Sequence, residues 1–245
     1  MKKNIKKSRY SIFIHGELIN LCIPNLLAIK KDGWADWFND IQELKATSHG
    51  IFPNNQKIQR KYFNNSKIDK TRIILLICDK PTNVAIGVIS LQNINIQSKT
   101  AEIAINSSSK KRNNVHPLSF LEAMALITQH GFEEVGLNRI YAGQVYPMLK
   151  SWNKLLELIG FKTDGYFEKS FVRGHEIKDV INLSCVYDDY LKIKKIRGSL
   201  WGSKNIINNT LKKQPKNSFT EVQIPVVTNK IPNNNYVEDL KNLGA

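Results

Sequence analysis

The sequence has little of several residue classes, and each shortage excludes a class of protein. Only three cysteines occur among 245 residues, far apart and each within an apolar run, so we expect buried free thiols in a reducing compartment (Cys22, Cys78 and Cys185). No stretch of about 18 apolar residues is present, so no transmembrane helix is predicted. The basic N-terminus lacks both an apolar segment and a small-residue cleavage site, so it does not resemble a signal peptide and we expect a cytoplasmic protein.

Acidic residues are scarce at both ends of the chain. The formal net charge is +15. Residues 1–10 carry five basic and no acidic side chains, and residues 191–245 carry ten basic and three acidic ones, so these ends hold +12 and residues 11–190 only +3. A nucleic-acid-binding core is therefore not indicated, although the ends can attract an anionic surface. We expect a basic tail (1–9), a domain (10–192) and a basic C-terminal extension (193–245).

The pattern of apolar residues predicts an α+β domain with one mostly antiparallel sheet flanked by helices. Strands are predicted at 10–22, 72–78, 84–94, 101–106, 138–145, 162–172 and 177–187, and helices around 34–38, 54–63, 117–135 and 149–159. Residues 199–245 lose this periodicity and are predicted to form an extended tail. Its apolar run at 222–227 favours docking onto the domain or onto a second subunit, which would make a homo-oligomer.

Several short strings occur in the order in which the GNAT superfamily of N-acetyltransferases has them. They are Ala85-Ile86-Gly87-Val88-Ile89-Ser90-Leu91, Ala101-Glu102-Ile103-Ala104-Ile105, Glu122-Ala123 with His130-Gly131-Phe132, Leu137-Asn138-Arg139-Ile140, and Leu158-Ile159-Gly160-Phe161. Residues 10–192 therefore resemble the GNAT fold, and Trp37-Phe38-Asn39-Asp40 resembles its ribosomal-protein-alanine and amino-sugar acetyltransferase branch. The resemblance implies acetyl-CoA as co-substrate and a primary amine as acceptor.

Two features depart from the family pattern. The family binds pyrophosphate with an Arg/Gln-x-x-Gly-x-Gly/Ala turn, whereas residues 112–117 keep the arginine but lack both small residues. Pro117 cannot donate a backbone N–H, so either the loop takes another path or the affinity for the cofactor is reduced. The tyrosine that many relatives use as general acid is replaced by Leu156.

Three residues are candidates for the chemistry. An amine must lose its proton before it attacks a thioester, so a base is required, and Glu102 is the candidate on the strand that resembles the thioester-binding one. Its alternative is a surface or salt-bridged carboxylate. Ser151 is the candidate donor to the leaving thiolate, or a helix cap, or both. Tyr146 is the candidate replacement for the missing phenol, or a packed aromatic.

The resemblance also assigns the binding residues. Cofactor binding falls to the backbone of one strand end and to the basic loop after it (Ile105, Asn106, Ser107, Lys110, Lys111, Arg112, Asn113 and Val115). Cations oppose the dipole of the helix that follows, so a polyanionic CoA would explain them; a solvated basic loop is the alternative. Trp37, Asp40 and His49 are assigned to the acceptor side, with ordinary packing as the alternative. No histidine has a metal-like partner, so no metal is expected.

The leading hypothesis is acetyl transfer to a small-molecule amine, such as an amino sugar or its nucleotide-linked form. The first alternative is a protein N-terminal acetyltransferase, which needs an open groove rather than a closed pocket. The second is a non-catalytic acyl-CoA-binding protein, which the altered phosphate loop motivates.

Overall fold

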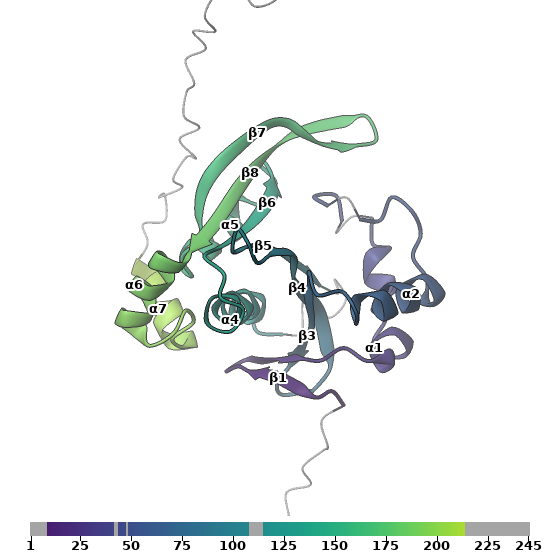
Figure 1. Cartoon of the computed structure of the whole chain (residues 1–245), viewed down its shortest axis with the longest axis horizontal. Helices are drawn as coiled ribbons and strands as arrows, with labels where there is room; N and C mark the ends of the chain where they lie inside the picture. The colour runs from purple at the N-terminus through teal and green to yellow at the C-terminus, as the bar shows by residue number, and fades with distance from the viewer. Residues whose placement is uncertain (1–8, 42–43, 48, 108–114, 214–245) are drawn as a thin grey trace, which may run out of the picture. The chain divides into compact units, whose positions relative to one another are not determined.

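The computed structural model describes residues 9–41, 44–47, 49–107 and 115–213, and these build one eight-stranded sheet with helices on both faces (Figure 1). The strand order is β1-β2-β3-β4-β5-β6-β8-β7. Every neighbouring pair is antiparallel except β5 and β6, which are parallel. The strands are β1 (Ile12–His15), β2 (Ile19–Cys22), β3 (Ile73–Asp79), β4 (Ala85–Asn95), β5 (Thr100–Ser107), β6 (Arg139–Val145), β7 (Lys162–Arg173) and β8 (Glu176–Val186).

Helices cover the two faces of the sheet in different ways. The long helix α4 (Ser119–Glu133) packs against the central strands, and its side chains are buried almost all round, as its apolar sequence predicts. On the opposite face, α1 (Leu26–Lys30), the 3₁₀ helix η1 (Asp36–Phe38) and α2 (Gln56–Ser66) enclose a second core around Trp34, Trp37 and Phe63. The short helix α5 (Lys150–Glu157) follows β6. No helix of the described part is long and apolar enough to cross a membrane.

A buried carboxylate fastens the first hairpin to α4. Glu122 is fully buried and accepts hydrogen bonds from the backbone N–H groups of Glu17 (2.5 Å), Leu18 (2.8 Å) and Ile19 (3.1 Å). Burial raises the pKa of Glu122, and the three N–H groups oppose that rise. Gly16 makes this approach possible, because an added Cβ would lie 2.8 Å from the Glu122 Oε1 atom. The segment 10–22, predicted as one strand, is therefore the hairpin β1–β2.

Residues 199–213 are not an extended tail, and that prediction is wrong for them. After α6 (Tyr187–Arg197), the chain buries Leu200, Trp201 and Ile207 and forms a further helix, α7 (Lys204–Lys213). Glu17 accepts hydrogen bonds at Oε2 from Trp201 Nε1 (3.0 Å) and from the Lys204 N–H (2.7 Å). The sequence missed these contacts because Glu17 lies nearly 190 residues away along the chain. Residues 214–245, and the basic residues 1–8, lie outside the described residues.

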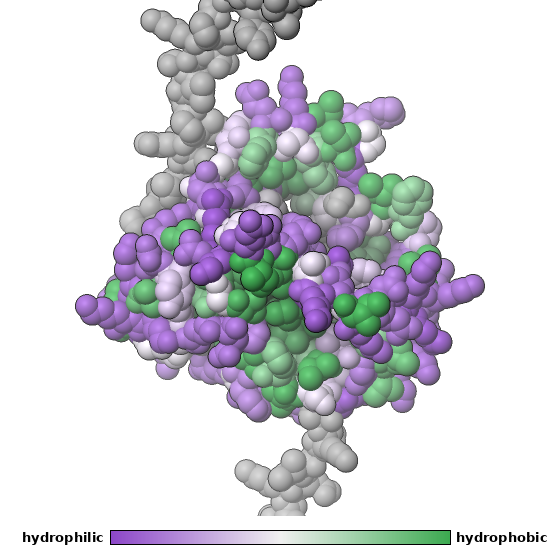
Figure 2. Space-filling view, in the orientation of Figure 1, coloured by the Kyte–Doolittle hydropathy of each residue, from purple (hydrophilic) through white to green (hydrophobic). Residues whose placement is uncertain are grey.

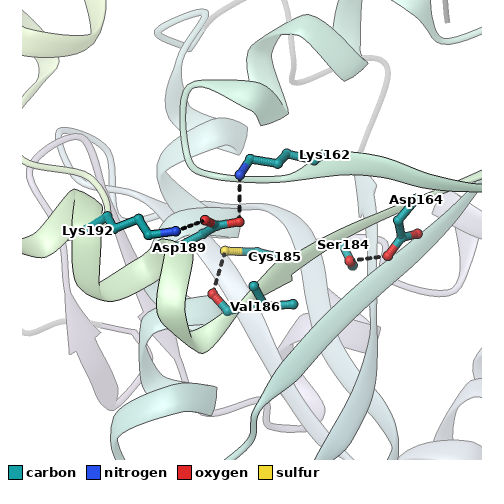
Figure 3. Close-up of polar contacts among 7 residues, drawn as sticks. All are labelled: Lys162, Asp164, Ser184, Cys185, Val186, Asp189 and Lys192. Carbon is teal, nitrogen blue, oxygen red and sulfur yellow. Dashed lines mark hydrogen bonds and ion pairs between the residues drawn. The ribbon is translucent and has the colours of Figure 1, made fainter. Parts of the chain in front are cut away.

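Ion pairs join α6 to the end of the sheet. Figure 3 shows Asp189 of α6 between Lys162 of β7 (2.8 Å) and Lys192 (3.1 Å). Beside them, burial raises the pKa of the Cys185 thiol to about 12. All three cysteines are free and buried, which confirms the prediction from their apolar surroundings. The region of α6 and α7 is mostly hydrophilic on the face seen in Figure 2.

Candidate functional site

The sheet opens between its two parallel strands. β5 and β6 pair only at Thr100–Arg139, Ala101–Ile140 and Glu102–Tyr141. Beyond that point β5 stays paired with β4 as far as Ser107, and β6 stays paired with β8 as far as Val145. The opening is therefore a gap between two strands that each keep their outer neighbour. Alternate backbone N–H and C=O groups of β5 point away from β4, so beyond Glu102 they face this gap.

A bulge and a glycine shape the β5 side of the gap. The β3–β4 register shifts between Ile77–Gly87 and Cys78–Ala85, which places Ile86 in a bulge of β4. Gly87 then pairs with Ser107, and a Cβ added at Gly87 would lie 2.6 Å from the Asn106 carbonyl oxygen. Glycine is therefore required for β5 to approach β4 this closely at its open end.

The candidate base lies where the two strands separate. Glu102 is the last β5 residue paired with β6, and its partner Tyr141 lies on the same face of the sheet. The Glu102 carboxylate accepts a hydrogen bond from Asn93 Nδ2 at 3.0 Å. On this face Thr100, Arg139, Tyr141, Phe167 and Asn182 line an open depression of about 280 Å³. Sequence reasoning missed Tyr141, although its place in the predicted strand 138–145 puts it on the face of Arg139.

Polar groups hold the floor of this depression. Asp164 accepts from Arg139 Nη2 (2.6 Å), from Asn182 Nδ2 (2.8 Å) and from the Ser184 hydroxyl. Figure 3 shows the contact between Asp164 and Ser184 across β7 and β8. Because Asp164 is the extra residue in the β7–β8 register, its carboxylate fixes the bulge there. Asp164 thus holds two polar residues that line the depression, Arg139 and Asn182, and Phe167 adds an aromatic ring to the lining.

The other two catalytic candidates lie at the open end of β6. The Tyr146 N–H bonds the Asp179 carbonyl (2.9 Å), and the Lys150 ammonium lies over the Tyr146 ring at 5.4 Å. Ser151 is exposed and forms no side-chain hydrogen bond within the described part of the chain. The helix α5 begins at Lys150 with Leu149 as its N-cap and has no side-chain cap, so the prediction that Ser151 caps this helix is wrong.

The predicted cofactor residues fall in two groups. Ile105, Asn106 and Ser107 lie on the unpaired edge of β5 beside the gap. Lys110, Lys111, Arg112 and Asn113 lie outside the described residues, whereas Val115 is described and half-buried. The helix α4 begins at Ser119, two residues after the predicted start at Pro117, and His116 bonds the Leu118 N–H through Nδ1 (3.2 Å).

The predicted acceptor residues gather on the β5 side of the gap. Trp37 is buried on η1, and its carbonyl accepts from Asn106 Nδ2 at 3.5 Å. The next residue, Phe38, packs edge-on against His49 with ring centroids 5.2 Å apart. Although His49 is exposed over part of its surface, desolvation lowers its pKa and favours the neutral imidazole. Asp40 lies two residues beyond Phe38, and its carbonyl accepts from the Leu44 N–H (3.1 Å).

Residues of this kind could hold a nucleotide thioester but do not form a metal site. In the described ranges, no group of three or more His, Cys, Asp or Glu side chains is close enough to bind a metal ion. The open strand edge offers backbone hydrogen-bonding groups to an extended arm, and Glu102 and Tyr141 stand where such an arm would end.

Solved structures share this architecture. The spermidine N-acetyltransferase of Vibrio cholerae, in complex with CoA and spermine, aligns with a TM-score of 0.62 at 16% identity over 72% of this chain and 99% of that one. A GNAT-family acetyltransferase from Bacillus anthracis gives 0.60 at 21% identity, over 72% and 99%. The Microcin C7 self-immunity acetyltransferase, in complex with acetyl-CoA and AMP, gives 0.59 at 22% identity, over 70% and 93%. No family model and no curated protein matches the sequence.

These likenesses show that the chain has the GNAT fold. The predicted α+β class and the mostly antiparallel sheet are confirmed. The ribosomal-protein-alanine or amino-sugar branch stays a prediction.

Proposed function

We propose that this protein is an acetyl-CoA-dependent N-acetyltransferase that acts on a primary amine. The observation that carries the proposal is the separation of β5 from β6 beyond Glu102 and Tyr141, which leaves a strand edge unpaired inside a sheet. The edge residues Ile105, Asn106 and Ser107 are half-buried, and unpaired backbone groups there are costly, so such an edge suits a ligand that pairs with them. The pantetheine arm of acetyl-CoA has amide groups along an extended chain and suits this edge at Ile105, Asn106 and Ser107.

Side chains at the two ends of the gap then carry out the acetyl transfer. Glu102 takes the proton from the amine, whose nitrogen attacks the acetyl carbonyl carbon. The carbon–sulfur bond breaks, and the thiolate of CoA takes a proton from Tyr146 or is stabilised by the Ser151 hydroxyl. Tyr141, next to Glu102, is added to these candidates as a donor to the reacting groups. The basic residues 110–112 remain proposed phosphate ligands, and no metal is needed.

The acceptor is proposed to be a small molecule. Support comes from the depression beside Tyr141, which is of small-molecule size, and from the spermidine acceptor named for the Vibrio cholerae neighbour. An amino sugar is the finer proposal. A protein N-terminus stays the alternative.

One experiment tests the activity. The protein is incubated with isotope-labelled acetyl-CoA and a panel of spermidine, glucosamine, a nucleotide-linked amino sugar and a short peptide with N-terminal alanine, and products are identified by mass spectrometry. Labelled product from one of the three small amines supports the proposal, and product from the peptide alone supports the N-terminal alternative. Acetyl-CoA binding by calorimetry without any product supports the non-catalytic reading.

We also retain two proposals about context. The apolar run at 222–227 supports a role of the C-terminal residues in forming a homo-oligomer, which light scattering of the whole chain and of a chain ending at Lys213 would test. A cytoplasmic location is supported by the buried free thiols.

A further inference from the structure

The segment from Asn39 to Asn54, of which the structure describes 39–41, 44–47 and 49–54, is a loop whose ends are joined. Asn39 accepts from the Asn54 N–H at Oδ1 (2.7 Å) and donates from Nδ2 to the Asn54 carbonyl (2.9 Å). A loop with adjoining ends and its own packed interior is an Ω-loop. Within it Leu44 is buried. Gly50 adopts φ +75°, and a Cβ added there would lie 2.8 Å from Leu44 Cδ1, so glycine is required at this position. The segment is called the acceptor loop below.

One side chain from the far half of the sheet holds this loop. Arg173 is the last residue of β7, and its Nη1 donates to the carbonyls of Leu44 (3.1 Å), Thr47 (2.6 Å) and His49 (2.8 Å). The three carbonyl oxygens share the two hydrogens of one guanidinium nitrogen, so one N–H is bifurcated, and together they form a site of partial negative charge that suits a permanently charged donor. No carboxylate takes part in these contacts, so this is recognition of backbone by a cation.

The contact spans the gap between β5 and β6. The acceptor loop follows η1, which contacts β5 through Trp37 and Asn106. The β7–β8 hairpin belongs to the β6 side of the sheet, and its free end reaches toward the side of α1 and α2 (Figure 1). Arg173 therefore connects the two halves of the sheet across the face that carries Glu102.

We propose that Arg173 is a positioning residue that fixes the acceptor loop on the β5 side of the gap, where the amine approaches Glu102, outside the depression lined by Tyr141 and Phe167. It touches the loop backbone rather than the reacting atoms, and it acts by placing His49 and the Phe38 ring that packs on it. The inference rests on the proposed function and deepens it. A loop held by three hydrogen bonds needs no ordering when the amine binds, so losing them should weaken amine binding more than the chemical step.

The experiment compares Arg173→Ala and Arg173→Lys with the parent, with His175→Ala as matched control. His175 lies in the turn of the same hairpin and forms no hydrogen bond, ion pair or ring contact with the acceptor loop among the described residues. The first measurement is independent of activity: the rate of trypsin cleavage after Lys45, an exposed residue of the loop, followed by mass spectrometry. We expect cleavage to rise by about 10-fold or more in Arg173→Ala, less in Arg173→Lys, and not in His175→Ala.

The second measurement is kinetic, with spermidine and glucosamine as acceptors and acetyl-CoA affinity followed by calorimetry. We expect the KM for the amine to rise by about 10-fold in Arg173→Ala, with a smaller fall in kcat and an acetyl-CoA Kd within about twofold of the parent. Unchanged cleavage overturns the inference, and so does a loss confined to kcat or to acetyl-CoA binding. If the parent acetylates neither amine, the proposed acceptor fails, and the cleavage rates alone decide whether Arg173 holds the loop. If Arg173→Ala does not fold, Arg173→Lys decides the question, because lysine keeps the positive charge but lacks the planar guanidinium group.

Discussion

Replacing Glu122 should show how much the first hairpin depends on one buried carboxylate. Its two oxygens take three backbone N–H groups from the β1–β2 turn, at 2.5 to 3.1 Å. In Glu122→Ala all three donors lose their acceptor. Ile19 is buried, so its N–H cannot regain water and costs about 1–3 kcal/mol. Glu17 is exposed and Leu18 half-buried, so their N–H groups recover part of the loss.

We therefore expect Glu122→Ala to lower the free energy of unfolding by about 2–4 kcal/mol. It includes the lost packing of the side chain and is reduced because burial already penalises the charged form, as the raised pKa of Glu122 indicates. Glu122→Gln keeps one oxygen for Leu18 and Ile19 but turns an NH₂ group toward the Glu17 N–H. We therefore expect a loss of about 1–2 kcal/mol for that variant.

Urea unfolding of the parent and both variants measures these differences. Glu134→Ala, at the C-cap of the same helix, is the control for replacing a glutamate of α4 and should change the free energy of unfolding by less than about 0.5 kcal/mol. The reasoning is refuted if Glu122→Ala is no less stable than this control, or if Glu122→Gln is the less stable of the two replacements.

Three further predictions concern Glu102, Glu133 and the C-terminal end of the described chain. Glu102→Gln should lower kcat by about 10²-fold or more, with partial recovery at high pH where the amine is already neutral; equal activity at pH 7 removes Glu102 from the mechanism. Although partial burial opposes it, hydrogen bonds from Lys194, Tyr190 and Gln129 hold the pKa of Glu133 at about 2, below its ordinary 4.5. The stability it contributes is therefore present above pH 4.5 and lost as pH falls toward 2, so unfolding of Glu133→Gln should depend less on pH in that window, by denaturant titration. A chain ending at Arg197 should be less stable than one ending at Lys213 by about 3 kcal/mol or more, because only the first loses the buried Leu200, Trp201 and Ile207; equal melting temperatures would show that these residues add nothing.

The sequence predicts the strands and the long helix well because each carries its own signal. β3 is a continuous Ile and Leu run that is buried at most positions, and α4 is apolar almost all round. Glu102 was predicted from its strand alone, and the structure places it where β5 and β6 separate. The helix at 34–38 was predicted from aromatic residues, but these residues pack a core from the short η1 and, for Trp34, from the turn before it. The regular helix lies earlier, at Leu26–Lys30.

The part of the site that sequence reasoning missed depends on contacts between distant residues. Arg173 meets carbonyls 124 to 129 positions away, and backbone carbonyls have no residue type to recognise. Tyr141 becomes a candidate only when the register shows that it pairs with Glu102. Ser151 was assigned as a cap because serine favours that position, whereas the helix starts at Lys150.

The end of the described chain shows most clearly that contacts between distant residues decide what the local sequence does not. Alone, α7 is a weak helix: its sequence has three Asn, and isolated helices of this length are marginal in water. Glu17 accepts the Lys204 N–H at its first turn, and the buried Ile207 anchors it to the domain, so tertiary contacts supply what the local sequence lacks. Glu17 lies in the same turn that Glu122 binds, so the hairpin β1–β2 connects α4 to α7. The first and last described elements of the chain therefore stabilise each other directly, through Glu17.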